Sequence, residues 1–216
     1  MQLPIYFFGD THFKVSKSNQ ENKKVEKFSK FLDSISKDNT KGSLFIMGDL
    51  FDYYFEYKNQ TSSDYEKIFT KIEEIKNKGF KIYFIAGNHD YWIGNYFKKY
   101  TTKTFLDDTS IDYKNNKIYV THGDGILSWD NSYRLLKRVL RSNIFIKMYS
   151  LLPKNIALKI AKKISHERKD SHYLDQEKIN RIHDELDSFA QQKIDGGFKY
   201  VIMGHYHHLY QKEIGR

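Results

Sequence analysis

Five short clusters of carboxylate, amide and imidazole side chains recur along the chain. They are Gly9-Asp10-Thr11-His12, Gly48-Asp49-Leu50-Phe51-Asp52, Gly87-Asn88-His89-Asp90, His122-Gly123-Asp124 and Gly204-His205-Tyr206-His207. Oxygen and imidazole donors suit manganese, iron or zinc, and the set is too rich in histidine for calcium or magnesium alone. Because the chain contains no cysteine, thiolate metal sites and disulfides are excluded.

The clusters together offer more metal ligands than one ion accepts. The candidates are Asp10, His12, Asp49, Asn88, His122, His205 and His207. Two ions that share one carboxylate would accommodate all of them. Any single cluster of this kind is a weak signal, because short motifs arise often by chance. The complete ordered series is a strong signal, because independent accidents would have to coincide.

Each cluster follows a short apolar run that is typical of a strand buried on both faces. These runs cover residues 5–8, 44–47, 82–86, 117–121 and 200–203. Apolar residues at three- and four-residue steps predict helices over about 25–35 and 65–75, and Gly79 follows the second. Alternating strands and helices predict an α/β fold with parallel pairing. Ligands of such sheets bind beyond the carboxyl ends of the strands, so we expect the clusters to converge.

Residues of about 126–196 differ from the rest, because their pattern is helical and contains no convincing strand. We expect them to form a helical insertion within a single domain that spans residues 1–216. From Asn131 to His166 there is no acidic residue, and lysines and arginines alternate with large apolar residues. This mixture suits an anionic membrane surface or an anionic, acyl-bearing ligand. The alternative is a pair of surface helices that pack their apolar faces on the core.

Composition indicates a folded protein with an anionic partner. The 216 residues are 39% hydrophobic and carry a net charge of +9, which excludes a disordered chain and favours nucleic acid, a phosphorylated small molecule or a lipid surface. No apolar run reaches the roughly 18 residues of a membrane span. The first residues lack the charged flank and cleavage site of a secretory signal. A cytoplasmic location is therefore expected.

The ordered clusters resemble the motifs of the calcineurin-like metallophosphoesterase superfamily. The resemblance covers nearly the whole chain and implies an αββα sandwich with two metal ions. It implies that the first metal is held by Asp10, His12, Asp49 and His207. It implies that the second is held by Asn88, His122, His205 and again Asp49, which would bridge the two ions. His89 is similar to the family's non-ligand histidine that faces the phosphate, and Asp52 would orient it.

A finer resemblance is to UDP-2,3-diacylglucosamine pyrophosphohydrolases. It is carried by the cluster around Asp49, by the stretch from Asn88 to Gly94, by His122-Gly123-Asp124-Gly125 and by the basic helical segment. It implies a nucleotide-linked glycolipid substrate, the products lipid X and UMP, Mn²⁺ as the metal, and lipid A biosynthesis at the inner face of the bacterial inner membrane. The substrate contacts that it implies are Asn88, Asp130, Ser165, Lys169 and His205. Asp130 could equally be a helix N-cap.

Two features of the chain depart from that family. Its members often have Arg at the position of His89 and Glu at that of Asp52, so the pair found here is closer to general phosphoesterases. Its members also continue with further strands, whereas this chain ends at Arg216, so a short member or a fragment is expected.

Two alternatives to a glycolipid pyrophosphohydrolase follow. One is a metal-dependent phosphodiesterase or nuclease, although charge alone is weak evidence for nucleic acid and that partner is not favoured. The other is a metal-free interaction scaffold, which the complete ligand set opposes, because an idle cluster of carboxylates and imidazoles is costly to hold together.

Overall fold

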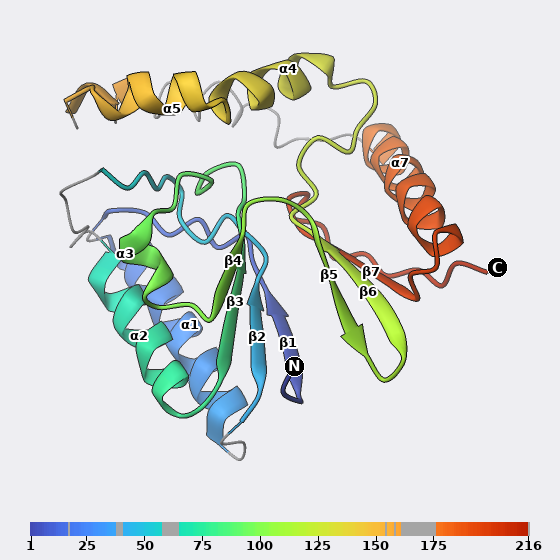
Figure 1. Ribbon diagram of the computed structural model, residues 1–216, viewed down its shortest axis with the longest axis horizontal. Helices are drawn as coiled ribbons and strands as arrows, with labels where there is room; N and C mark the ends of the chain where they lie inside the picture. Colours follow the sequence, from blue (N-terminus) through green and yellow to red (C-terminus); the bar gives the residue numbers. More distant parts are fainter. Residues whose placement is uncertain are drawn as a thin grey trace. The chain divides into compact units, whose positions relative to one another are not determined.

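The computed structural model describes residues 1–16, 18–37, 41–57, 65–153, 155–157, 159–160 and 176–215. The chain divides into two compact units (Figure 1). The first comprises Met1–Asp124 and Phe198–Leu209, and the second comprises Gly125–Gly197 and Tyr210–Arg216. That the chain is a single domain with a helical insertion stays a prediction.

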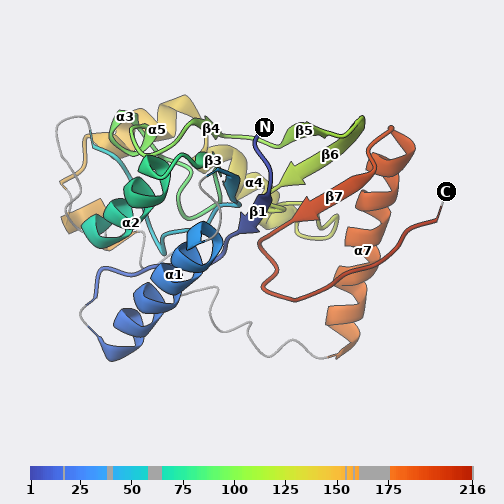
Figure 2. The ribbon, with the colours of Figure 1, turned by 90° about the horizontal axis from the view of Figure 1, so that it is seen from below.

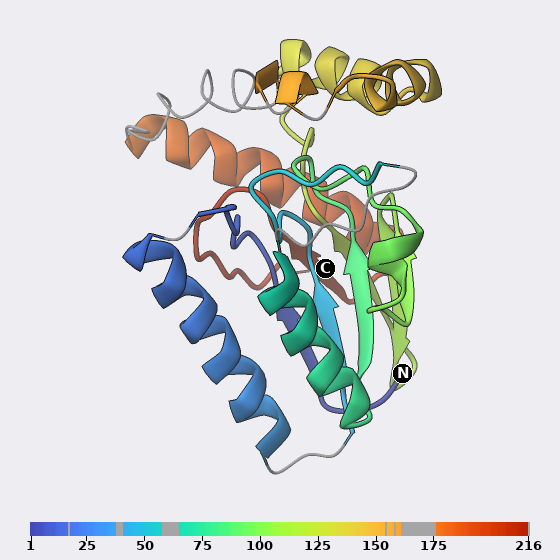
Figure 3. The same cartoon turned by 90° about the vertical axis from the view of Figure 1, so that its left-hand side faces the viewer.

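A parallel sheet forms the centre of the first unit. Its strands lie in the order β1 (Ile5–Phe8), β2 (Ser43–Ile46), β3 (Lys81–Ile85) and β4 (Lys103–Phe105), and every neighbouring pair is parallel. The strands predicted over 5–8, 44–47 and 82–86 and their parallel pairing are thereby confirmed. The helices α1 (Asn19–Lys37) and α2 (Glu66–Asn77) connect these strands and lie side by side on one face of the sheet (Figure 3). A short helix, α3 (Asn95–Lys98), precedes β4.

A second sheet covers the other face of the first (Figure 2). It consists of β5 (Thr109–Tyr113), β6 (Asn116–Thr121) and β7 (Tyr200–Met203), with β6 antiparallel to β5 and parallel to β7. The strands predicted over 117–121 and 200–203 are confirmed. The α, β and β layers of this unit are consistent with the expected αββα sandwich.

Neither β4 nor β5 was predicted from the sequence. β4 has three residues, and β5 alternates between exposed and buried positions, so neither contains the continuous apolar run that marked the other strands. The β5–β6 hairpin closes through Lys114 and Asn115, both in the left-handed region with φ of 45° and 62°. That two-residue loop matches the right-handed twist of the strands.

The pleat of β2 explains why its sequence is apolar at every position. Leu44 and Ile46 face the core that α1 and α2 cover, and there they pack with residues such as Phe28 and Ile72. Phe45 belongs instead to the core between the two sheets. Successive side chains of a strand point to opposite faces, so a strand between two cores needs apolar residues on both. Burying each large side chain contributes about 1.5–3 kcal/mol.

The described part of the second unit is helical and contains no strand. It includes α4 (Asn131–Leu140), α5 (Asn143–Ser150) and α7 (Gln176–Asp195). The side chain of Asp130 caps α4 by accepting from the Tyr133 amide at 3.1 Å, and Ser142 caps α5 by accepting from Phe145 at 3.2 Å. Within the described chain, no helix combines the length and the apolar character that crossing a bilayer requires.

Candidate metal centre

All seven predicted ligands lie in the loops that follow β1, β2, β3, β6 and β7 of the first unit. Hydrogen bonds between main-chain atoms join these loops. The amide of Asp10 donates to Gly48 at 3.1 Å, and the amide of Gly204 donates to His122 at 3.0 Å. The amide of His205 donates to both carboxylate oxygens of Asp10, at 3.0 and 3.1 Å, and so links the two sheets. The clusters converge as the strand order predicts.

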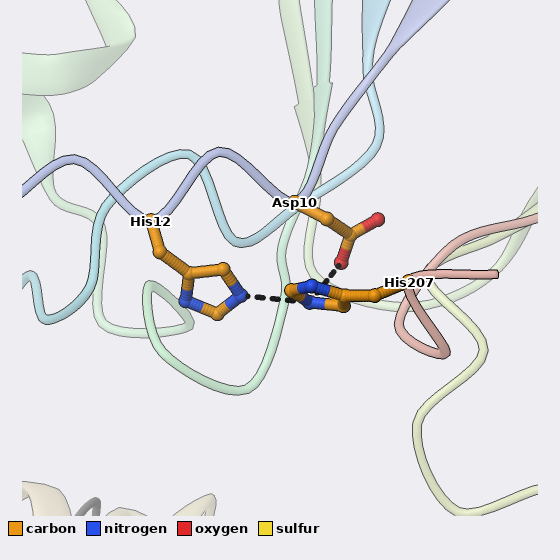
Figure 4. Close-up of side chains that lie close together, drawn as sticks. All are labelled: Asp10, His12 and His207. Atoms are coloured by element: carbon orange, nitrogen blue, oxygen red, sulfur yellow. Dashed lines mark hydrogen bonds and ion pairs between the residues drawn. The ribbon is translucent and has the colours of Figure 1, made fainter. Parts of the chain in front are cut away.

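Asp10, His12 and His207 form the first group (Figure 4). Nε2 of His12 lies 3.0 Å from Nε2 of His207, and Nε2 of His207 lies 3.7 Å from Oδ1 of Asp10. Burial lowers the pKa of His12 to about 4. The His12 imidazole is therefore neutral near pH 7, the form that offers a nitrogen lone pair to a metal.

Asp49, His122 and His205 form the second group, and Asn88 lies beside it. Nε2 of His122 lies 3.5 Å from Oδ2 of Asp49 and 3.2 Å from Oδ1 of Asn88. The same Oδ2 atom of Asp49 is 3.6 Å from Nε2 of His12 in the first group. One carboxylate oxygen thus faces both groups, which is the position that a bridging ligand needs.

A main-chain contact orients His122. Its Nδ1 lies 2.8 Å from the carbonyl oxygen of Met47, and since a carbonyl only accepts, Nδ1 carries the hydrogen. Nε2 is then the atom that faces Asp49 and Asn88. In metal-binding histidines, one ring nitrogen usually donates a hydrogen bond to a carbonyl or carboxylate, and the other ring nitrogen is left to bind the metal. His122 has this arrangement.

Buried charges dominate the electrostatics of the second group. Burial by itself would raise the pKa of Asp49, but the adjacent His122 imidazole holds it well below its usual range. Burial opposes the charged form of His122, yet the Asp49 carboxylate outweighs it and raises the pKa of His122 to about 10. Burial, with the charge of His122, lowers the pKa of His205 to about 3. The anionic carboxylate thus attracts positive charge to this point, and the oxygen and nitrogen donors fit divalent ions.

The loops adopt unusual backbone conformations at the predicted ligands. Positive φ angles occur at Asp10, His12, Asp49, His205 and His207. Such angles are uncommon outside glycine, and they persist where surrounding contacts hold the backbone in place. Gly87 has a different role, because a Cβ atom there would collide with Oδ1 and the amide nitrogen of Asp49. The close approach of the two loops therefore requires glycine at position 87.

His89 and Asp52 lie next to the first group. The ring of His89 meets the ring of His12 edge-on, with the centroids 4.7 Å apart. Nδ1 of His89 lies 2.6 Å from the main-chain carbonyl oxygen of Asp52, and the amide of His89 donates to Oδ1 of Asp49 at 2.9 Å. The main-chain carbonyl of Asp52 thus accepts a hydrogen bond from the ring of His89, and the orienting role of Asp52 stays a prediction.

Asp90 belongs to one of the predicted clusters, but the sequence suggested no role for it. Its carboxylate is fully buried and accepts from the amides of Gly87, Asp49 and Leu50 at 2.9, 3.2 and 2.8 Å. Burial, with the neighbouring charge of Asp49, raises the pKa of Asp90 to about 7. Asp90 therefore connects the loops after β2 and β3. The signal that could have revealed it is a carboxylate directly after the Asn88-His89 pair.

The predicted substrate contacts have different positions in the chain. Asn88 and His205 lie at the second group. Asp130 lies in the second unit, where its capping of α4 confirms the alternative reading as an N-cap and leaves a substrate contact a prediction. Ser165 and Lys169 lie outside the described residues.

Comparison with known proteins identifies the family. Residues 3–209 match the family model described as calcineurin-like phosphoesterase. The chain belongs to the calcineurin-like phosphoesterase family. As a member, it is a metal-dependent hydrolase, and its Asp and His groups are candidate ligands of the dimetal centre that the family implies.

Several relatives of this phosphoesterase carry the name UDP-2,3-diacylglucosamine hydrolase. One from Haemophilus influenzae (strain PittGG) is 32% identical over 174 residues, which are 79% of this chain and 72% of the relative. One from Proteus mirabilis is 27% identical over 168 residues, or 76% of this chain and 68% of the relative. One from Neisseria meningitidis serogroup B is 27% identical over 206 residues, or 94% of this chain and 82% of the relative.

Proposed function

We propose that this phosphoesterase cleaves the pyrophosphate bond of UDP-2,3-diacylglucosamine and releases UMP and 2,3-diacylglucosamine 1-phosphate, lipid X. The main support for this substrate is the similarity to relatives named UDP-2,3-diacylglucosamine hydrolase, at 27–32% identity over most of the chain. The proposal makes the protein an enzyme of lipid A biosynthesis.

The ligand assignment is part of this proposal. Asp10, His12 and His207 would hold one divalent ion, Asn88, His122 and His205 would hold the other, and Asp49 would serve both. The position of Oδ2 of Asp49 between His12 and His122 supports this division. We take Mn²⁺ as the metal. Bound ions of this kind neutralise phosphate oxygens and lower the pKa of a bound water toward 7.

His89 would supply a proton to the departing phosphate oxygen. Its Nδ1 donates a hydrogen to the carbonyl of Asp52, so the proton for the leaving group would come from Nε2, which carries one in the imidazolium form. A positioned general acid contributes about 10²–10⁴-fold to the rate. The partly buried hydrogen bond from the His89 amide to Oδ1 of Asp49 would fix the main chain of the acid against the proposed bridging carboxylate.

The helices α4 and α5 of the second unit support a lipid-bearing substrate. These helices and the C-cap of α5 expose large apolar side chains, namely Leu135, Val139, Ile144, Met148 and the C-cap Leu151, which is 84% exposed. Exposed basic residues accompany them, namely Arg134, Arg138 and Lys147. The combination of exposed apolar and basic side chains suits acyl chains and an anionic lipid surface. The proposal therefore includes peripheral attachment to the inner face of the inner membrane.

The test is hydrolysis of purified UDP-2,3-diacylglucosamine by the Mn²⁺-loaded protein, followed as UMP release. Bis(p-nitrophenyl) phosphate and single-stranded DNA are compared under the same conditions. The expected result is UMP release that greatly exceeds both other reactions. No UMP alongside rapid cleavage of another phosphodiester would defeat the proposal, and salt-sensitive DNA binding with cleavage would favour a nuclease. Absence of bound metal together with inactivity on all three substrates would favour a scaffold.

A further inference from the structure

Lys24, on the first half of α1, reaches the loop that carries His12. Its Nζ donates to the main-chain carbonyl oxygens of His12 and Thr11, at 2.7 and 3.0 Å. These two carbonyls are consecutive, so a single ammonium group fixes both peptide planes on either side of the His12 backbone. Hydrogen bonds from a charged donor are about twice as strong as neutral ones.

Glu21, one turn earlier on α1, completes this attachment. Oε2 of Glu21 lies 3.2 Å from Nζ of Lys24, and Oε1 accepts from the amide of Lys14 at 2.9 Å. Glu21 is only 5% exposed, which is rare for a carboxylate unless it is paired. The two side chains therefore bind the segment 11–14 to α1 at three main-chain groups.

Lys24 and Glu21 hold the segment that contains His12, a residue with an unfavourable backbone conformation. His12 has φ of 46°, a left-handed conformation that is uncommon in a residue with a Cβ atom. On the opposite side, the amide of His12 donates to the carbonyl of Asp49 at 2.9 Å. The His12 main chain is thus held between the Asp49 loop and Lys24. That conformation directs Nε2 toward Nε2 of His207 and Oδ2 of Asp49.

We propose that Lys24 is a positioning residue that sets the affinity of the first metal site through the main chain of His12. The proposal rests on the two-metal function proposed above. Lys24 does not contact the site itself, and its effect is confined to the ion that His12 helps to hold. Supporting residues of this type typically change metal affinity by about 10–100-fold when they are replaced.

The test is a titration of the metal-stripped full chain with Mn²⁺ alone, by calorimetry and by electron paramagnetic resonance. Lys24→Met keeps most of the aliphatic stem but removes the ammonium group, whose Nζ also lies 5.6 Å from the centre of the Phe13 ring. Lys24→Arg keeps a charged donor. Lys30→Met is the matched control, since Lys30 lies on the same helix and pairs only with Glu26 in the described structure. All variants are first compared by thermal unfolding, and Lys24→Gln replaces Lys24→Met if the latter does not fold.

We expect wild type and Lys30→Met each to bind two Mn²⁺ ions. Each binding step should have the same affinity in both proteins. Lys24→Met should weaken one binding step by about 10–100-fold, delay the spin-coupled Mn²⁺ signal to higher metal concentration, and leave the other step unchanged. Lys24→Arg should restore most of the loss. In a His12→Ala background, which lacks the affected ligand, Lys24→Met should no longer change the remaining step.

Other results would overturn the proposal. If Lys24→Met binds both ions as wild type does, Lys24 has no positioning role, while the two-metal function stands. If Lys24→Met weakens both steps alike, or weakens the remaining step in the His12→Ala background, its effect is a general loosening of the fold. If wild type binds no Mn²⁺, the two-metal function and the positioning role fail together.

Discussion

Nε2 of His12 and Nε2 of His207 lie 3.0 Å apart, although 195 positions separate the two residues in the chain. Two imidazole nitrogens at this distance can share one hydrogen, and a cation between such groups would replace it. Because burial keeps His12 neutral near pH 7, no charge repulsion separates the pair. The contact therefore brings the first and last motifs of the chain together at the first candidate metal site.

Asp49→Asn should remove most of the activity. The substitution keeps the size of the side chain but removes the negative charge that faces both groups. We expect kcat on bis(p-nitrophenyl) phosphate to fall by about 10³-fold, since metal ions supply several kcal/mol of charge stabilisation. Metal analysis should show fewer than two bound ions. Asp112→Asn, on the exposed side of β5, is the control and should keep wild-type values. Full activity of Asp49→Asn would rule out a bridging role.

His89→Ala should separate chemistry from metal binding. The variant loses the proposed proton donor but none of the predicted ligands, so kcat should fall by about 10²–10⁴-fold with two ions still bound. Asp52→Asn should cause a smaller loss, because the main-chain carbonyl that contacts His89 remains. Steady-state kinetics with parallel metal analysis provide the measurement. An equal or greater loss in Asp52→Asn would show that the carboxylate, and not the carbonyl, supports His89.

Gly87→Ala should damage the site by steric conflict alone. The added Cβ atom would collide with the Asp49 carboxylate and amide, and Gly87 has no positive φ that alanine would strain. We expect Mn²⁺ affinity to fall by about 10-fold or more as the carboxylate shifts. Isothermal titration calorimetry measures the change. Gly215→Ala makes the same substitution in open space and should have no effect. Unchanged Mn²⁺ affinity in Gly87→Ala would mean that the loops after β2 and β3 can separate enough to accept a Cβ atom.

Asp90→Ala should lower stability as well as activity. The amides of Gly87, Asp49 and Leu50 would lose their buried acceptor, and each unsatisfied group costs about 1–3 kcal/mol. We expect the free energy of unfolding of the metal-free protein to fall by about 3 kcal/mol or more. Urea unfolding followed by circular dichroism checks this value. Asp112→Ala, at an exposed position, should stay within about 0.5 kcal/mol of wild type. A similar small change in Asp90→Ala would contradict its anchoring role.

Replacing Ile144 and Leu151 together with serine should weaken binding to lipid vesicles. These side chains are 74% and 84% exposed, so the loss acts on the surface and not on the core. Cosedimentation with vesicles of phosphatidylglycerol and phosphatidylcholine should fall by about 10-fold or more, given about 1.5–3 kcal/mol for each large apolar side chain. Leu209→Ser is the control in the first unit, where Leu209 is fully exposed. Binding by the double variant that equals wild type would exclude α5 from the lipid contact.

The sequence by itself determined the strands of the buried parallel sheet and the position of the motifs. A strand such as β2 lies between two cores, so its apolar run is continuous and easily recognised. Parallel strands that are connected by helices end at one edge of the sheet, so motifs after consecutive strands must meet there. β4 and β5 were not predicted, because a short or alternating strand leaves a weak pattern in the sequence.

Only the tertiary structure decided which atoms face one another. That Asp49 presents one oxygen to both His12 and His122, and that Nδ1 of His122 is occupied by Met47, depends on side-chain and loop conformations. The supporting contacts of Lys24 and Asp90 are of the same kind. They join different segments of the chain through main-chain atoms, which every residue possesses and no sequence motif marks.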